Sequence, residues 1–170
     1  GSWKKNHKPF AVHRLDRDTS GVMMFALTEN AQKIFSDNWH KIVTSRKYIA
    51  VAENPSTKKN IADKGLIDKP LAQNQYNQSY VPLTKTDKHG KIIPTVKART
   101  NYEILHRGKK FTMFQLELDT GKKNQIRAHL AFLGYPLCGD ENYRAKTNPF
   151  NRLALHARTI SFTHPFTKEE

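Results

Sequence analysis

Two β-prone runs joined by a short basic turn constrain the fold of this 170-residue chain more than any other feature. TVKARTNYEIL (95–105) and FTMFQLEL (111–118) are rich in β-branched and aromatic residues, and residues 106–110 between them are typical of a hairpin turn. The run ARTISFTH (157–164) predicts a final strand. We therefore expect one α+β domain with a substantial antiparallel sheet.

The N-terminal third predicts a strand, a helix and a second strand. VMMFAL (22–27) is continuously apolar, which predicts a short strand buried on both faces. Thr28 is placed to cap a helix from about Glu29 to Val43, because its hydroxyl oxygen can accept a free backbone N–H of the first turn. KYIAVA, which starts at Lys47, alternates like a second strand.

The rest of the chain contains a polar middle and a second helix. Residues 54–94 are rich in Lys, Asn, Gln, Asp and Pro, and they predict either a linker between two subdomains or a mobile substrate-binding loop. Within them, TKTDKHGK (84–91) is typical of an exposed turn. A helix is expected from about Lys123 to Leu133, with Gly134 ending it.

The net charge indicates a polyanionic partner. Lys and Arg number 29 against 15 Asp and Glu, a formal charge of +14. Nucleic acid is the first expectation, and a basic surface kept only for solubility is the alternative. No apolar run approaches the roughly 20 residues of a membrane span, so no membrane partner is expected. Cys138 is the single cysteine, which excludes an internal disulfide and favours a cytoplasmic protein.

The segment HRLDRDTSG (13–21) carries the first candidate for chemistry. Asp16 lies between Arg14 and Arg17, so nearby positive charge is expected to hold its carboxylate ionised and in place. The alternative is an ordinary turn in which the aspartate bonds to its own backbone. Asp18 is the weaker candidate, because its side chain is expected to face solvent.

The segment TGKKNQIRAHLAFLG (120–134) carries the second candidate. Lys123 and Arg127 are four residues apart and are expected to be neighbours on one helix face, where two like charges favour a bound anion. Lys122, Lys123 and the helix N-terminus together form a candidate phosphate cradle. Ile126, Leu130 and Leu133 form the apolar stripe of this helix. Arg127 borders the stripe, so its guanidinium is expected to be partly buried against a carboxylate. A solvated basic helix face is the alternative for the two lysines.

Four motifs in order resemble the RluA-type pseudouridine synthases. They are HRLDRDTSG (13–21), KYIAV (47–51), TGKKNQIRAHLAFLGYPLCGDENY (120–143) and LALHARTISFTHPF (153–166). The resemblance implies an α+β catalytic domain with a mixed, largely antiparallel sheet, peripheral helices and a central cleft. It also implies isomerisation of uridine to pseudouridine in structured RNA, either rRNA or tRNA, by a protein expected to be monomeric.

The resemblance also implies roles for individual residues. Asp16 matches the family's essential aspartate, Tyr48 its active-site tyrosine, and Arg127 the arginine that pairs with the aspartate. Substrate-binding roles are implied for His13, Arg14, Thr19, Lys122, Lys123, Asn124 and Gln125. Lys122 and Asn124 stand where many members carry Arg and His. The eight histidines show no paired metal spacing, and neither a metal nor an organic cofactor is expected.

Domain limits and competing functions complete the expectations. Residues 3–170 are interpreted as a catalytic domain trimmed at both ends, and Gly1-Ser2 as a cloning remnant. RNA phosphates are expected along the cleft, on Lys122 and Lys123 and on the 106–110 turn through Arg107, Lys109 and Lys110. The alternatives are a catalytically silent RNA-binding or ribosome-assembly protein on the same scaffold, and a generic basic DNA-binding protein.

Overall fold

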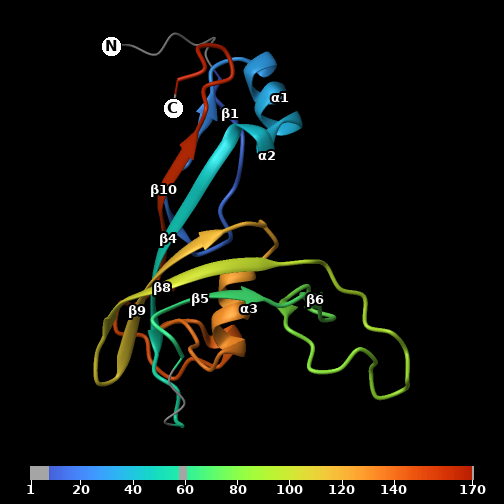
Figure 1. The fold of residues 1–170 in the computed structure, drawn as a ribbon, viewed down its shortest axis with the longest axis vertical. Helices are drawn as coiled ribbons and strands as arrows, with labels where there is room; N and C mark the ends of the chain where they lie inside the picture. The colour runs from blue at the N-terminus through green and yellow to red at the C-terminus, as the bar shows by residue number, and fades with distance from the viewer. Residues whose placement is uncertain (1–7, 58–60, 170) are drawn as a thin grey trace.

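A six-stranded sheet is the central element of the domain. The structure is a computed structural model that describes residues 8–57 and 61–169. The predicted cloning remnant, Gly1-Ser2, lies outside the described residues. The strand order is β2-β10-β4-β9-β8-β5, with β2 parallel to β10 and every other pair antiparallel, so the expected mixed, largely antiparallel sheet is confirmed (Figure 1).

The elements have the following bounds. The strands are β1 (Phe10–Ala11), β2 (Ser20–Gly21), β3 (Phe25–Ala26), β4 (Val43–Glu53), β5 (Lys64–Asp68), β6 (Ala72–Gln73), β7 (Ser79–Tyr80), β8 (Arg99–Arg107), β9 (Phe111–Leu118) and β10 (Leu155–Phe162). The helices are α1 (Glu29–Asp37), α2 (Trp39–Ile42), α3 (Gln125–Phe132) and the 3-10 turn η1 (Glu141–Tyr143). The predicted hairpin and final strand are thus confirmed as β8–β9 and β10.

Helix α3 covers one face of the sheet and forms the main core with it (Figure 1). Alternate residues of β4 face this helix: Ala50 and Ala52 are fully buried beneath Ile126 and Leu130. Tyr48 lies two residues before Ala50 and is therefore on the same face. Its strand neighbours across the sheet are Leu116 on β9 and Ala157 on β10. This register places the Tyr48 ring at the edge of the α3 core.

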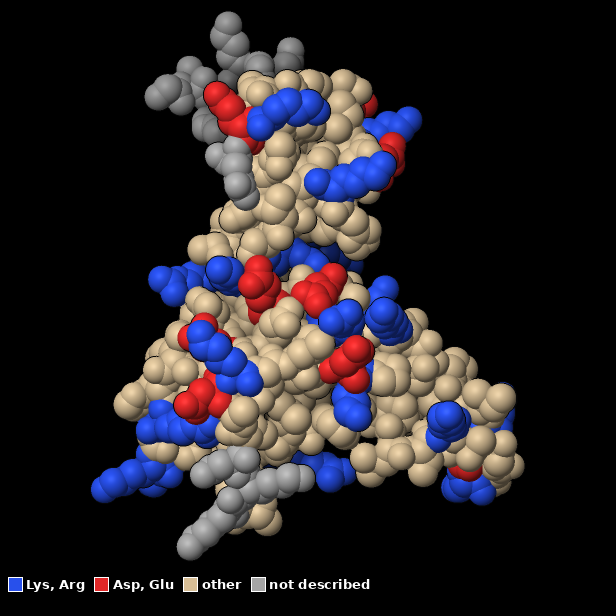
Figure 2. Space-filling model, viewed as in Figure 1, with Lys and Arg blue, Asp and Glu red and all other residues tan. Residues whose placement is uncertain are grey.

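A second, smaller core lies at the other end of β4, beneath α1 and α2. Val12, Ala26, Phe35 and Ile42 are buried there. The space-filling view narrows between this part and the part that contains α3 (Figure 2). On the face shown, Lys and Arg are spread over both parts, and Asp and Glu lie among them near the middle.

The predicted strand over 22–27 is wrong in extent and burial. Only Phe25–Ala26 pair as β3, with β1, and Val22, Met23 and Leu27 are exposed. The central places of the main sheet are occupied by longer strands, so this run lies outside it. The predicted helix from Glu29 is capped by Thr28 as expected, with the Ala31 N–H donating to Oγ1 at 3.1 Å. It breaks at Asn38, whose backbone and side-chain N–H groups both donate to the Ile34 carbonyl.

The polar middle is neither a linker nor a single loop. Residues 64–68 form β5, the edge strand of the main sheet, and β6 and β7 pair as a small hairpin. The predicted turn within 84–91 is confirmed, since the Gly90 N–H donates to the Asp87 carbonyl. Helix α3 begins later than predicted, at Gln125. Lys123 therefore precedes the helix and does not stack against Arg127 on a helix face.

Candidate active site

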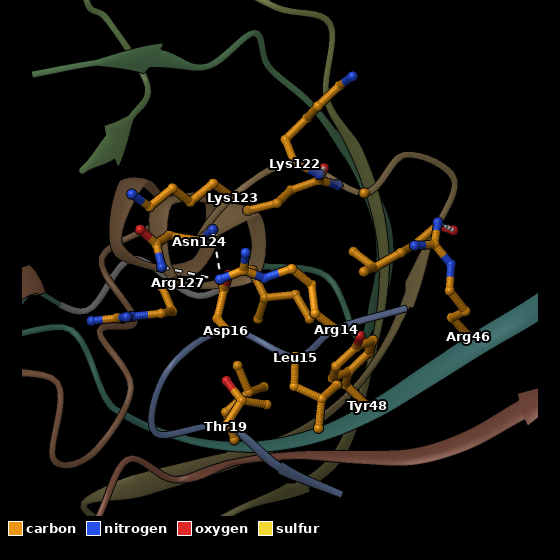
Figure 3. Close-up of a pocket in the computed structure, with 15 residues that line it drawn as sticks. Arg14, Leu15, Asp16, Thr19, Arg46, Tyr48, Lys122, Lys123, Asn124 and Arg127 are labelled. Carbon is orange, nitrogen blue, oxygen red and sulfur yellow. Dashed lines mark hydrogen bonds between the residues drawn. The ribbon is translucent and has the colours of Figure 1, made fainter. Parts of the chain in front are cut away.

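A cavity of about 400 Å³ lies where the HRLDRDTSG segment meets β4 and the start of α3 (Figure 3). Residues 13–21 form one side, which we call the loop wall, and residues 120–127 form the other, which we call the α3 wall. Every residue to which the resemblance gave a catalytic or substrate-binding role, except His13, lines this cavity. His13 lines a neighbouring cavity on the other side of Arg14 and Leu15.

Asp16 is held from the α3 wall by a single residue. Asn124 donates to the Asp16 carboxylate twice, from its backbone N–H at 2.7 Å and from Nδ2 at 3.1 Å (Figure 3). Asn124 has a φ of 51°, a left-handed conformation that Asn tolerates better than most residues. That conformation, directly before α3, aims its N–H at the loop wall. The N-terminal end of α3, one part of the predicted phosphate cradle, is therefore occupied by the protein's own aspartate.

Arg127 does not pair with Asp16 as the resemblance implied. Its Nε and Nη2 each donate to the Asp140 carboxylate at 2.7 Å, and its guanidinium points away from Asp16 (Figure 3). The Asp140 side chain is 1% exposed, and a carboxylate buried to that degree requires a cation. The Arg127 guanidinium also lies 5.1 Å from the centroid of the Tyr143 ring. The expectation that Arg127 is buried against a carboxylate is confirmed, with Asp140 as that carboxylate.

The charge state of Arg127 follows from this pairing. Burial opposes its charge, but the hydrogen bond and the negative charge of Asp140 outweigh burial and raise the Arg127 pKa. Arg127 is thus a fixed cation, and the carboxylate of Asp140 balances much of its charge. The sequence did contain a signal for Asp140, because it lies in the Gly-Asp turn of the third motif. Its distance of 13 residues from Arg127 along the chain conceals the contact.

Tyr48 faces the cavity as a protonated phenol. Burial raises the pKa of Tyr48 above its ordinary value, and the charge of Arg46 offsets this only in part. Arg46, rather than Arg127, is the cation that acts on Tyr48. The side chains of Tyr48 and Leu15 lie side by side at one end of the cavity (Figure 3).

The loop wall is shaped by a tight turn and a glycine. The Thr19 N–H donates to the Asp16 carbonyl at 3.1 Å, which closes the turn. Gly21 has a φ of 137°, and a Cβ at that position would lie 2.2 Å from the Ala157 carbonyl oxygen, so only glycine fits against β10. Asp18 is exposed, as expected. The Thr19 hydroxyl is buried and has no hydrogen-bond partner among the described residues.

Gln125 ties the α3 wall to the sheet. Its Nε2 donates to the Arg99 carbonyl at 2.8 Å and to the Thr100 hydroxyl at 2.9 Å. Its Oε1 accepts from the Thr120 hydroxyl and the Lys122 N–H. The amide nitrogen and the amide oxygen each have two protein partners, and Gln125 also lines the cavity, so its substrate-binding role stays a prediction. Thr100 continues the network to His129, which was not expected to take part.

The basic turn at 106–110 does not reach the cavity. Leu118, at the end of β9, lines it, whereas this turn lies at the opposite end of the same strand. Arg107 pairs with Asp63 there, with Nη2 2.9 Å from the carboxylate. The expectation that Arg107, Lys109 and Lys110 line the cleft is therefore wrong. Lys122 and Lys123 do line it.

Within residues 8–57 and 61–169, no group of three His, Cys, Asp or Glu side chains is arranged to hold a metal ion. In the same part of the chain, no helix is long and apolar enough to cross a membrane.

Comparisons with known proteins agree with the motifs. The family model described as RNA pseudouridylate synthase matches residues 2–132. "Ribosomal large subunit pseudouridine synthase D" of Pasteurella multocida is 33% identical over 93% of this chain and 49% of its own length. "tRNA pseudouridine synthase C" of Haemophilus ducreyi is 32% identical over 97% of this chain and 71% of its own. The chain spans about half the length of most curated relatives that it matches.

A solved structure supports the fold independently of sequence. "Human RNA Pseudouridylate Synthase Domain Containing 1" superposes with a TM-score of 0.73 at 21% identity, covering 90% of this chain and 63% of that one. The α+β class expected from the sequence is thereby confirmed. The motifs, the family model and the relatives agree, and the chain belongs to the RNA pseudouridylate synthase family, in its RluA-type branch.

Proposed function

We propose that this chain is the catalytic domain of an RNA pseudouridine synthase, with Asp16 as its essential carboxylate. The observation that carries the proposal is the placement of Asp16: two donors of Asn124 fix its carboxylate in a cavity that Tyr48 and Arg127 also line. The proposal covers residues 3–170, and its substrate is a uridine in structured RNA. Relatives are named for the ribosomal large subunit and for tRNA, so we propose rRNA and tRNA as the candidate substrates.

One carboxylate is sufficient for this reaction. Hydrolysis of a glycosidic bond uses two carboxylates, because one must activate a water or attack the sugar while the other supplies a proton. In pseudouridine formation the detached uracil itself attacks the sugar through its ring carbon, so no water is activated. Asp16 either attacks the anomeric carbon or removes a proton from the neighbouring sugar carbon. The cleaved N–C bond is replaced by a C–C bond, and the ring carbon then loses its proton.

Tyr48 serves this reaction as a neutral group. A tyrosine has an ordinary pKa near 10, and burial raises that of Tyr48 further. A resident tyrosinate at neutral pH is therefore disfavoured. We assign Tyr48 to packing against the uracil ring and to relaying the departing proton through its hydroxyl.

Arg127 contributes a cation that needs no rearrangement. Its two bonds to Asp140 hold it at the cavity wall before substrate binds, so its field is in place while charge develops near Asp16. A lysine cannot reproduce the planar two-pronged contact with Asp140. Arg127 is thus a fixed electrostatic group, held by Asp140 as its positioning residue.

Access to the cavity requires an unpaired uridine. A uridine inside a stem must be flipped out of its stack, at a cost of a few kcal/mol. Contacts of Arg14, Lys122 and Lys123 with phosphates would offset that cost and make binding sensitive to salt. We further infer that the protein acts as a monomer in the cytoplasm, since one chain supplies every residue assigned here.

Release of tritium from RNA labelled at the uracil ring carbon that loses its proton tests the proposal. We expect release by the wild type and none by Asp16→Asn, which keeps the size of the side chain but cannot act as nucleophile or base. Asp18→Asn is the matched control, because it removes the same charge from an exposed position two residues away. Salt-sensitive RNA binding without release by the wild type would support the silent RNA-binding alternative instead.

A further inference from the structure

A second cavity, of about 230 Å³, adjoins the catalytic one. Arg14, Leu15, Arg46 and Tyr48 line both cavities, so they form the partition between the two. Pockets for drug-sized ligands measure roughly 300–1,000 Å³. The second cavity is therefore suited to one planar ring system, and a ring in it would lie one side chain away from a ring in the catalytic cavity.

Aromatic rings form a fixed corner of the second cavity. The rings of His13 and Trp39 lie with their centroids 5.3 Å apart at 39°. The Met24 N–H donates to His13 Nε2 at 3.0 Å, which fixes the His13 ring. Burial lowers the His13 pKa, so the imidazole is neutral and presents an uncharged face. Val22, which is 39% exposed, adds an apolar edge. Neutral aromatic and apolar surfaces of this kind stack unpaired nucleobases without regard to sequence.

Arg46 supplies an unbalanced positive charge between the two cavities. Its guanidinium lies 6.0 Å from the Trp39 ring centroid, and its Nη2 donates to the Leu118 carbonyl at 3.3 Å. A Cβ at Gly121 would lie 2.6 Å from Nη1, so the guanidinium packs directly against this glycine. Among the described residues, no carboxylate forms an ion pair with Arg46. A half-buried guanidinium without an acid is suited to a phosphate.

We propose that the second cavity binds an unpaired nucleobase adjacent to the target uridine, and that Arg46 contacts the phosphodiester between the two nucleotides. The inference rests on the proposed function for the uridine in the first cavity. It identifies the substrate as a dinucleotide step in which both bases are unstacked from any helix. Trp39 and Arg46 are then binding residues that the catalytic motifs do not include.

Short RNAs with one base removed test this proposal. The probe is a single-stranded nonamer with one central uridine, compared with versions in which the 5′ or the 3′ neighbour is an abasic ribose. Affinity is measured by fluorescence anisotropy at low salt with Asp16→Asn, so that the RNA stays unmodified. Loss of a stacked base is expected to weaken binding about 5- to 100-fold for one of the two neighbours. Equal affinities for all three RNAs would overturn the proposal.

A protein variant then assigns the effect to Trp39. In the Asp16→Asn background, adding Trp39→Leu is expected to weaken binding of the intact RNA to the level at which the protein with Trp39 binds the sensitive abasic RNA. Combining Trp39→Leu with the abasic RNA should cause little further loss of affinity. Tyr76→Leu is the matched control, because Tyr76 is 78% exposed and lines neither cavity. Losses that multiply independently would show that the base does not lie on Trp39, and would overturn the proposal.

Fluorescence provides a readout that needs no change in the cavity. The chain has two tryptophans, so Trp3→Phe leaves Trp39 as the single emitter. Intact RNA is expected to quench its emission, and the sensitive abasic RNA to quench it less; equal quenching would contradict the proposal even if Trp39→Leu failed to fold.

Tritium release separates the two hypotheses. If quenching depends on the neighbouring base but no tritium is released, the second cavity binds a base and the proposed function fails. If tritium is released but quenching does not depend on the neighbour, the proposed function holds and the base-binding proposal fails.

Discussion

The two walls of the catalytic cavity are fixed by different kinds of contact. The α3 wall is tied to the sheet by a continuous chain of buried and partly buried hydrogen bonds. The chain runs from Thr120 through Gln125 and Thr100 to His129, and from there to the Lys69 carbonyl. Arg127 and Asp140 add a buried ion pair behind it. Each polar group in this chain has a partner, so the wall is expected to stay in place without substrate.

The loop wall depends on fewer contacts. Among the described residues, Asn124 is the one whose side chain or backbone bonds to the Asp16 carboxylate, and the buried hydroxyl of Thr19 has no partner there. Arg14, Arg17 and Asp18 are exposed. The comparison shows a division of labour: the α3 wall supplies preorganised charge, and the loop wall is anchored to β10 at Ser20 and Gly21. It carries the reactive carboxylate on residues 14–19, a segment with few tertiary hydrogen bonds among the described residues. Segments of that kind open and adjust at low free-energy cost, as a site that must admit a flipped nucleotide requires.

The largest effect is expected from separating Arg127 and Asp140. Asp140→Ala leaves a buried guanidinium without its acid, and breaking a buried pair in this way costs about 3–5 kcal/mol in the free energy of unfolding. Urea denaturation measures this cost. Asp18→Asn, in the loop wall, should change the free energy by less than about 0.5 kcal/mol.

A double variant separates stability from catalysis at the same site. Arg127→Met combined with Asp140→Leu removes both charges and is expected to recover most of the lost stability, because apolar replacements of a buried pair are often neutral. This stable double variant is nevertheless expected to have no turnover, because it lacks the Arg127 cation at the cavity wall. Normal turnover by this stable variant would show that Arg127 has only a structural role.

Gln125→Leu is expected to have the next largest effect. The substitution leaves the Arg99 carbonyl, the Thr100 hydroxyl and the Lys122 N–H without their partner, and each buried group left unpaired costs about 1–3 kcal/mol. We expect a lower urea midpoint and weaker turnover. Lys109→Gln, an exposed change in the turn that does not reach the cavity, is the control. A Gln125→Leu protein of normal stability would mean that the α3 wall does not depend on this network.

The sequence predicted the elements of the α3 wall better than the contacts within it. The apolar stripe of α3, its ending at Gly134 and the burial of Arg127 follow from local periodicity, and all three are confirmed. The partners are different. Asp140 lies on a later turn, and Thr100 and His129 belong to β8 and α3, so their contacts depend on how the sheet and helix pack. Local patterns do not contain that information.

The loop wall shows the opposite pattern. Its motif identified Asp16 directly, and the Thr19 N–H closes a turn on the Asp16 carbonyl. Gly21 lies in β2, where it packs against β10. The strand predicted immediately after it failed, because the apolar run 22–27 was interpreted as buried although longer strands occupy the centre of the sheet. Hydrophobicity predicted strand-forming tendency correctly for Phe25 and Ala26 alone. Competition between strands for central positions is a property of the whole chain.

A moderate effect is expected from acid, through His129. Burial lowers the pKa of this fully buried histidine, and it is neutral in the network, with Nε2 donating to the Lys69 carbonyl and Nδ1 accepting from Thr100. The unfolded chain binds a proton near pH 6.5, whereas the folded chain does not. The free energy of unfolding should therefore fall as the pH drops below about 6.5 and level off below the folded pKa. Urea denaturation between pH 7.5 and 5.5 measures this slope, which His129→Gln should reduce.

The smallest effect on stability is expected in the loop wall, at Thr19. Thr19→Val replaces a buried hydroxyl that has no partner among the described residues with a methyl group of similar size. Because no hydrogen bond is lost, the free energy of unfolding should stay within about 0.5 kcal/mol of wild type or rise slightly. Ser20→Ala, which removes a hydroxyl that bonds to His156 and Arg152, is the contrasting control and should be destabilising. If Thr19→Val keeps its stability but loses turnover, the unpaired hydroxyl is reserved for the substrate. A marked loss of stability would instead mean that the loop wall is as tightly bonded as the α3 wall, and the contrast between them would fail.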